Sequence, residues 1–100
     1  MLISELIKKR TRPFYSLEFF PPKEESHMPG FFKAASELKE MNPLFVSVTY
    51  GAGGSRQANT LEVACTLKNK LGFEPMTHLT CVGSKREAIA DYLAKLRHEG

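Results

Sequence analysis

Glu18 is the residue whose type and position most clearly suit chemistry. It lies in an aromatic-rich segment, residues 14–20, which is predicted to form a strand and is stopped by Pro21 and Pro22. An ionised carboxylate without a partner is costly to bury, whereas a carboxyl group in apolar surroundings keeps its proton and can act as an acid near neutral pH. The alternative is a structural ion pair with a lysine or arginine of a neighbouring strand. Spacing alone supports both interpretations equally.

Further polar groups stand at the ends of the next two predicted strands. Thr49 and Tyr50 close segment 44–50, and His78 lies within segment 75–82. Because parallel strands bring their carboxyl ends to one edge of a sheet, we expect these groups to converge on a ligand site there. Taken singly they decide little. A tyrosine suits both ring stacking and packing, and a lone histidine is more often a satisfied core residue than a ligand contact.

A glycine-rich loop over residues 51–55, which contains Ala52, joins the second predicted strand to a helix. The backbone N–H groups of such a loop can approach a ligand closely. The loop matches neither the GxGxxG dinucleotide fingerprint nor the phosphate-binding P-loop, which requires a lysine. Pattern alone therefore favours a plain turn between strand and helix.

Strand and helix patterns alternate three times along the chain. Each predicted strand is followed by apolar residues at helical spacing. These positions are Phe31, Ala34, Ala35, Leu38 and Met41, then Leu61, Ala64, Cys65 and 68–71, then Ile89, Tyr92, Leu93 and Leu96. Ser55 is a predicted cap of the second of these helices and Gly72 its C-terminal turn, while Ser84 and Glu87 form a predicted capping box for the third. A short amphipathic helix over residues 2–7 precedes all three units.

Three consecutive βα units predict an α/β fold with a parallel sheet and right-handed crossovers. Two architectures fit, an open doubly wound sheet and the start of a (β/α)8 TIM barrel. A complete barrel needs about 250 residues, so the 100 residues of this chain cannot close one, and the third strand keeps an unpaired edge. We therefore expect the first three βα units of a TIM barrel, incomplete in this chain. The leading helix occupies residues 1–12 and the βα units residues 13–100.

Composition sets limits on the class of protein. The chain is 42% hydrophobic and 25% charged, as ordinary globular domains are. Its net charge of +3 is spread out apart from one cluster at residues 8–12, which argues against a nucleic-acid role. We expect no membrane span and a cytoplasmic location, since the start lacks the order of a signal peptide. Cys65 and Cys81 lack ligand spacing and are predicted to be small buried residues, with no disulfide and no metal.

Three segments together resemble the methylenetetrahydrofolate reductase family. They are residues 17–23 (LEFFPPK), 45–55 (FVSVTYGAGGS) and 78–83 (HLTCVG). They look like the first three strand-end motifs of that family, in the same order and at the same spacing. The resemblance runs from about residue 14 to residue 100, and three ordered motifs make it specific.

The resemblance implies a single (β/α)8 domain that holds FAD at the carboxyl ends of its strands. Such enzymes pass a hydride from NAD(P)H through the flavin to 5,10-methylenetetrahydrofolate, giving 5-methyltetrahydrofolate for methionine synthesis. By the same resemblance Glu18 is the catalytic general acid when the methylene bridge opens. Thr49 contacts the nicotinamide substrate, and Tyr50, Ala52 and His78 contact the flavin. The complete enzyme is expected to be a homo-oligomer that acts on a small-molecule folate.

The family's later motifs, including an Arg-Gly-Asp segment, belong to strands that follow the three units seen here. We therefore expect the 100-residue chain alone to be inactive. Two alternatives stand beside the reductase interpretation. One is a non-catalytic truncated α/β fragment, and the other is a different folate-dependent barrel enzyme such as a methyltransferase.

Overall fold

Helices and strands alternate along the chain in the order that the sequence predicts. The computed structural model describes residues 2–50 and 57–100. The helices are α1 (Ile3–Lys8), α2 (Met28–Leu38), α3 (Gln57–Asn69) and α4 (Arg86–Glu99), and the strands are β1 (Ser16–Phe19), β2 (Phe45–Val48) and β3 (Pro75–Thr77). Two short 3-10 helices, η1 (Glu25–His27) and η2 (Lys39–Met41), flank α2. The leading helix and the three βα units are thus confirmed as elements.

The three strands form one parallel sheet in the order β1-β2-β3. Glu18 of β1 stands opposite Ser47 of β2, and Val48 of β2 stands opposite Thr77 of β3. This arrangement confirms the α/β class and the parallel sheet. Closure into a barrel stays a prediction, because three strands are compatible with both architectures considered above.

The strands are shorter than the sequence pattern suggests, most of all β3, which ends at Thr77 rather than at residue 82. The backbone N–H of His78 still donates to the Val48 carbonyl (2.9 Å), and the chain then enters a turn in which Ser84 N–H donates to the Cys81 carbonyl (3.1 Å). The expectation that Cys81 is a buried strand residue is therefore wrong. Cys81 is an exposed free thiol in this connection, while Cys65 is a half-buried free thiol on α3.

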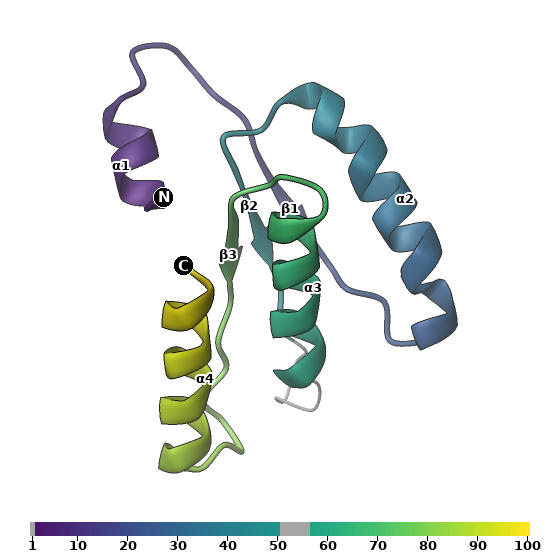
Figure 1. The fold of residues 1–100 in the computed structure, drawn as a ribbon, viewed down its shortest axis with the longest axis vertical. Coiled ribbons are helices and arrows are strands. Elements are labelled where there is room, and N and C mark those ends of the chain that lie inside the picture. The colour runs from purple at the N-terminus through teal and green to yellow at the C-terminus, as the bar shows by residue number, and fades with distance from the viewer. Residues whose placement is uncertain (1, 51–56) are drawn as a thin grey trace.

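One face of the sheet packs against α2 and α3. Val46 and Val48 are fully buried there, and Phe19 meets the rings of Phe31 and Phe73 edge-on with centroids 5.8 Å apart in each pair. The buried core comprises Phe19, Ala35, Val46, Val48, Val63, Ala64, Leu67 and Phe73. Figure 1 shows α3 lying over the strands, with α2 and α4 on either side of it. Each fully buried side chain of this size contributes about 1.5–3 kcal/mol, so this layer fixes where the strands lie.

The buried stripe of α3 differs in part from the predicted one. Its buried positions among the described side chains are Thr60, Val63, Ala64 and Leu67, at helical spacing. The predicted Leu61 and Cys65 are half-buried beside them. Thr60 belongs to the stripe because its hydroxyl donates to the Thr49 carbonyl (3.1 Å), which satisfies its polar group at the end of β2.

Helix ends confirm one predicted signal and contradict another. Gly72 follows α3 with φ +75°, the left-handed conformation expected of a terminating glycine. The capping box of Ser84 and Glu87 is wrong, because α4 begins at Arg86 with Lys85 at its N-cap and no side-chain cap. Ser84 already takes part in the preceding turn. The predicted cap at Ser55 lies outside the described residues.

The opposite side of the sheet, which we call the open face, carries the side chains that alternate with the core residues. By the strand register they include Ser16, Glu18, Phe45, Ser47 and Met76, and the same alternation extends to Phe20 and His78, which directly follow β1 and β3. Phe20 and Met76 are exposed on it, at 71% and 43%. Ser47 is buried, because β2 is flanked by a strand on each side. Polar groups from β1, from β2 and from the residue after β3 therefore lie on one face of the sheet, with Ser47 buried and Glu18 and His78 partly exposed.

Candidate active site

Glu18 and Ser47 meet across β1 and β2. They are direct neighbours in the parallel register, so their side chains leave the sheet on the same face. The Ser47 hydroxyl donates a hydrogen bond of 2.9 Å to Oε2 of Glu18. Glu18 keeps 47% of its side chain exposed. The expectation that apolar surroundings bury this carboxyl group is therefore wrong. The alternative of a lysine or arginine partner from a neighbouring strand stays a prediction, since among the described residues the ion-pair partner of Glu18 is His78.

His78 completes the group that we call the Glu18 cluster: Glu18, Ser47 and His78. It follows β3 directly rather than lying in the middle of a strand, and its backbone hydrogen bond to β2 fixes its position. Its Nε2 lies 3.5 Å from the same Glu18 Oε2, and 42% of its side chain is exposed. The expected convergence of strand ends is thus confirmed for Glu18 and His78, which are 60 residues apart in sequence.

Thr49 and Tyr50 leave β2 in different environments. The Thr49 backbone continues the sheet, since its N–H donates to the Phe19 carbonyl (3.0 Å), and its side chain is half-buried. Tyr50 is buried, with its ring edge-on to Tyr92 of α4 at a centroid distance of 6.2 Å. Its hydroxyl is buried and finds no hydrogen-bond partner among the described residues. The Tyr50 ring therefore belongs to the helix side and not to the Glu18 cluster. Ala52, together with its loop, lies outside the described residues.

Ser47 is the member of the cluster that sequence reasoning missed. A signal for it was present, since Ser47 interrupts the run Phe45-Val46-Ser47-Val48 in a strand otherwise built for the core. A hydroxyl at a central strand position needs a hydrogen-bond partner when it is buried. The partner became identifiable only through the register, which places Ser47 beside Glu18.

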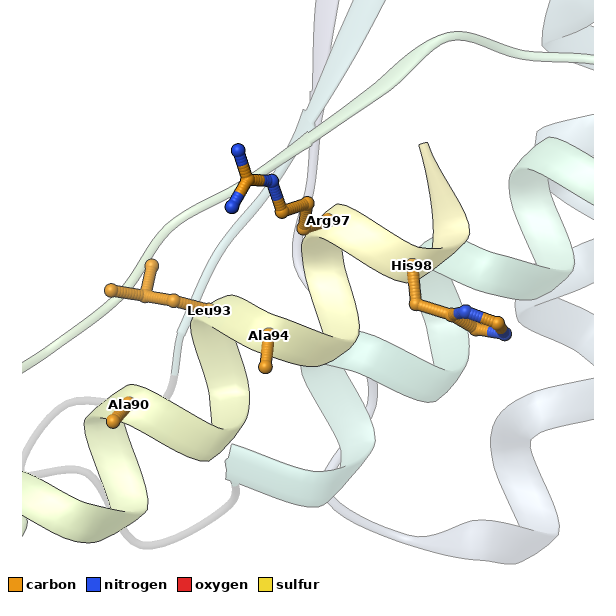
Figure 2. Close-up of a pocket in the computed structure, with 5 residues that line it drawn as sticks. All are labelled: Ala90, Leu93, Ala94, Arg97 and His98. Atoms are coloured by element: carbon orange, nitrogen blue, oxygen red, sulfur yellow. The ribbon is translucent and has the colours of Figure 1, made fainter.

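A separate hollow lies on the outer surface of α4 (Figure 2). It is lined by Ala90, Leu93, Ala94, Arg97 and His98. All five residues come from this single helix, and none belongs to the Glu18 cluster. The hollow therefore does not add a group to the candidate site.

The part of the chain that the structure describes offers neither a metal site nor a membrane-crossing helix. Within residues 2–50 and 57–100, no group of three or more His, Cys, Asp or Glu residues could hold a metal ion. Across the same ranges, no helix has the length and apolar character needed to cross a membrane. The expected absence of a metal stays a prediction.

Comparison with known proteins shows which family this sequence belongs to. The model of the family described as methylenetetrahydrofolate reductase matches residues 2–100. The chain belongs to the methylenetetrahydrofolate reductase family. It is 40% identical over 86 residues to methylenetetrahydrofolate reductase (NADH) 1 of Arabidopsis thaliana, and 36% identical over 76 residues to 5,10-methylenetetrahydrofolate reductase of Pectobacterium carotovorum.

These matches cover most of this chain and a small part of each relative. They include 86% of the chain and 14% of the Arabidopsis protein, and 76% of the chain and 26% of the Pectobacterium protein. A relative from Schizosaccharomyces pombe, methylenetetrahydrofolate reductase 1, is 34% identical over 86 residues, which are 14% of its length. The chain therefore spans about a quarter or less of the relatives that it matches.

Proposed function

We propose that this chain forms the first three βα units of a flavin-dependent (β/α)8 reductase domain. That domain would reduce 5,10-methylenetetrahydrofolate to 5-methyltetrahydrofolate at the expense of NAD(P)H. Residues 1–12 supply the leading helix and residues 13–100 the three units. The observation that carries the proposal is the Glu18 cluster, a carboxyl group and an imidazole brought together at the strand ends in a chain of this family.

Met76 and His78 of the open face suit a planar cofactor such as FAD. His78 presents a partly exposed imidazole beside Glu18, and Met76 exposes apolar surface on the same face. A bound FAD would supply the hydride transfer between the nicotinamide and the folate. We propose that His78 and Ala52 contact it and that Thr49 contacts the nicotinamide substrate. For Tyr50 we propose a backbone contact, since its ring is committed to Tyr92.

Glu18 is the proposed general acid. As the methylene bridge opens, one carbon–nitrogen bond of the folate breaks and the departing nitrogen takes a proton from the Glu18 carboxyl group. The other nitrogen is left as an iminium, which accepts the hydride. The exposed position of Glu18 allows a ligand to reach it, and neighbouring strands hold it in place. The Arabidopsis relative's name specifies NADH, so NADH is the donor to test first.

The test uses a protein extended to full barrel length, purified with FAD. We expect NADH to bleach the flavin absorbance and methylenetetrahydrofolate to restore it. In the Glu18→Gln variant, bleaching by NADH should proceed as in the parent, while restoration by the folate should slow by about a hundredfold or more, as loss of a general acid predicts. A parent protein that binds no flavin, or a variant that is reoxidised by folate at the parent rate, would overturn the proposal.

The alternative of a non-catalytic fragment has its own support, because Phe20 and Met76 are exposed on the open face of the 100-residue chain. It predicts that this chain alone retains no flavin after gel filtration, while the barrel-length protein does. If both retain flavin, the fragment interpretation fails. If neither does, the reductase proposal fails with it.

A further inference from the structure

Ser47 and Glu18 differ sharply in exposure although they touch. Ser47 is 7% exposed on the central strand, whereas the Glu18 side chain is 47% exposed. The hydrogen bond between them therefore joins a fixed donor to a carboxyl group that a ligand can reach. At 2.9 Å it is within the usual range for a hydroxyl donor to a carboxyl oxygen, while the His78 contact at 3.5 Å is longer than a strong hydrogen bond.

Both contacts converge on the same oxygen. Ser47 Oγ and His78 Nε2 each approach Oε2 of Glu18. A protonated carboxyl group has one carbonyl oxygen, which accepts hydrogen bonds, and one hydroxyl, which donates. A carbonyl oxygen is the better acceptor, so the Ser47 hydroxyl favours the arrangement in which Oε2 is the carbonyl oxygen of a protonated Glu18. In that arrangement Oε1 bears the proton and faces the ligand.

We propose that Ser47 is a positioning residue for proton transfer: it anchors Oε2 of Glu18, so that Oε1 carries the proton to the departing nitrogen of the folate. This inference rests on the proposed function. When the proton leaves Oε1, the electron pair of the broken carbon–nitrogen bond stays on the nitrogen, which the proton neutralises. Glu18 becomes a carboxylate. The Ser47 hydrogen bond then stabilises the new charge, because bonds to ionised acceptors are stronger than those to neutral ones.

A purely structural interpretation competes with this one. Ser47 is buried and needs an acceptor, so Glu18 could serve only to satisfy the serine hydroxyl. The two interpretations differ in what loss of the hydroxyl does. A structural role affects folding and flavin binding, whereas a positioning role affects only the step in which Glu18 gives up its proton.

Three substitutions of Ser47 in the barrel-length protein with FAD separate these roles. Ser47→Thr keeps the hydroxyl, and Ser47→Val has the shape of threonine without it. Ser47→Ala removes the hydroxyl with the least change in volume. The matched control is Ser16→Ala, which removes a serine hydroxyl from the same face of the sheet, on β1, at a position with no hydrogen bond to Glu18.

We expect Ser47→Val and Ser47→Ala to slow the folate-dependent reoxidation of flavin by about tenfold or more, the effect of losing one hydrogen bond to a charged group. Reduction of the flavin by NADH should be unchanged, and Ser47→Thr should restore the folate step. Ser16→Ala should match the parent. Parent-like folate rates in both Ser47→Val and Ser47→Ala would overturn the inference, as would an equal loss in both half-reactions.

A second readout needs neither flavin nor turnover. In the barrel-length apoprotein labelled with carbon-13 at the glutamate carboxyl groups, the Glu18 signal is identified by its loss in Glu18→Gln. We expect Ser47→Val to shift this signal, with Ser47→Thr and Ser16→Ala leaving it near the parent position. An unmoved signal in Ser47→Val would show that the anchor is absent. If Glu18→Gln slows the folate step and Ser47→Val does not, the proposed function stands and only the positioning role falls.

Discussion

Tyr92 places a titratable phenol in the layer between α4 and the sheet. It is 3% exposed, and its ring meets Tyr50 edge-on. Burial raises the pKa of the Tyr92 phenol above its ordinary value, because a phenolate would lose its water there. A contact with Thr77 lowers that pKa, and the neighbouring Tyr50 raises it, each by less than burial does. Folding therefore favours the neutral form of Tyr92.

This preference makes stability depend on pH in a defined direction. A phenol whose pKa is higher in the folded chain stabilises it fully below the unfolded value, about 10. That contribution is lost as the pH rises through the folded value. We expect the midpoint of thermal unfolding to fall above about pH 10 and to fall less in Tyr92→Phe than in the parent.

The control for this prediction is Tyr15→Phe, since Tyr15 is 66% exposed. Its midpoint should follow that of the parent across the same alkaline range, because an exposed phenol is solvated in both states. An alkaline fall in Tyr92→Phe as steep as in the parent would show that the Tyr92 phenol does not drive the effect.

The residue types predicted which groups form the site better than they predicted the exposure and hydrogen-bond partners of those groups. Glu18 could be named from its type and its position near a strand end, whereas His78 rested mainly on the resemblance to the reductase family. The exposure of Glu18 and its hydrogen bond to Ser47 could not be predicted from the sequence, because both depend on the register between β1 and β2. Tyr50 shows the same limit. Its position at a strand end was evident, but the packing that turns its ring toward Tyr92 comes from α4, more than 40 residues later.

At the scale of elements, two glycines test how backbone conformation stabilises the helices. Gly72, in the turn that follows α3, has φ +75°, and a Cβ there would meet only the Lys39 side chain at 3.8 Å, an ordinary contact. Gly30 lies within α2, where a Cβ would meet nothing within 4 Å. The two sites differ in conformation rather than in available space.

Replacement of each glycine by alanine should therefore shift stability in opposite directions. Gly72→Ala forces an L-residue into the left-handed region and should destabilise the fold by about 1 kcal/mol. Gly30→Ala should stabilise it by about 0.5–1 kcal/mol, because alanine loses less backbone entropy in a helix. Chemical denaturation of the two variants beside the parent measures both. Shifts of the same sign would contradict the conformational argument.

The existence of the elements was predictable, whereas their ends were less so. Helical spacing located α2, α3 and α4, and Gly72 was recognised as a terminator. The start of α4 was misplaced because Ser84 and Glu87 have the types of a capping box, yet the turn after β3 uses Ser84 first. The turn after β3 therefore determines where α4 begins, and the spacing of residues within the helix cannot reveal this.

At the scale of the whole molecule, the sheet of the 100-residue chain has one packed face and one open face. The core lies against α2 and α3, while Phe20 and Met76 remain exposed on the other side. Among the described strands β3 pairs only with β2, so its outer edge offers free backbone groups. Exposed apolar surface beside an unpaired strand edge favours association with another copy.

We therefore expect the 100-residue chain, studied alone by sedimentation, to associate in a concentration-dependent manner. Met76→Lys places a charge on the open face of β3 and should weaken this association, because a buried, unpaired ammonium group is costly. The matched control is Met41→Lys, since Met41 in η2 is similarly exposed, at 48%, but lies outside the open face. Equal effects of the two lysines would trace the association to net charge. A parent chain that stays monomeric at every concentration would show that the open face is stable in water and would contradict the expected association.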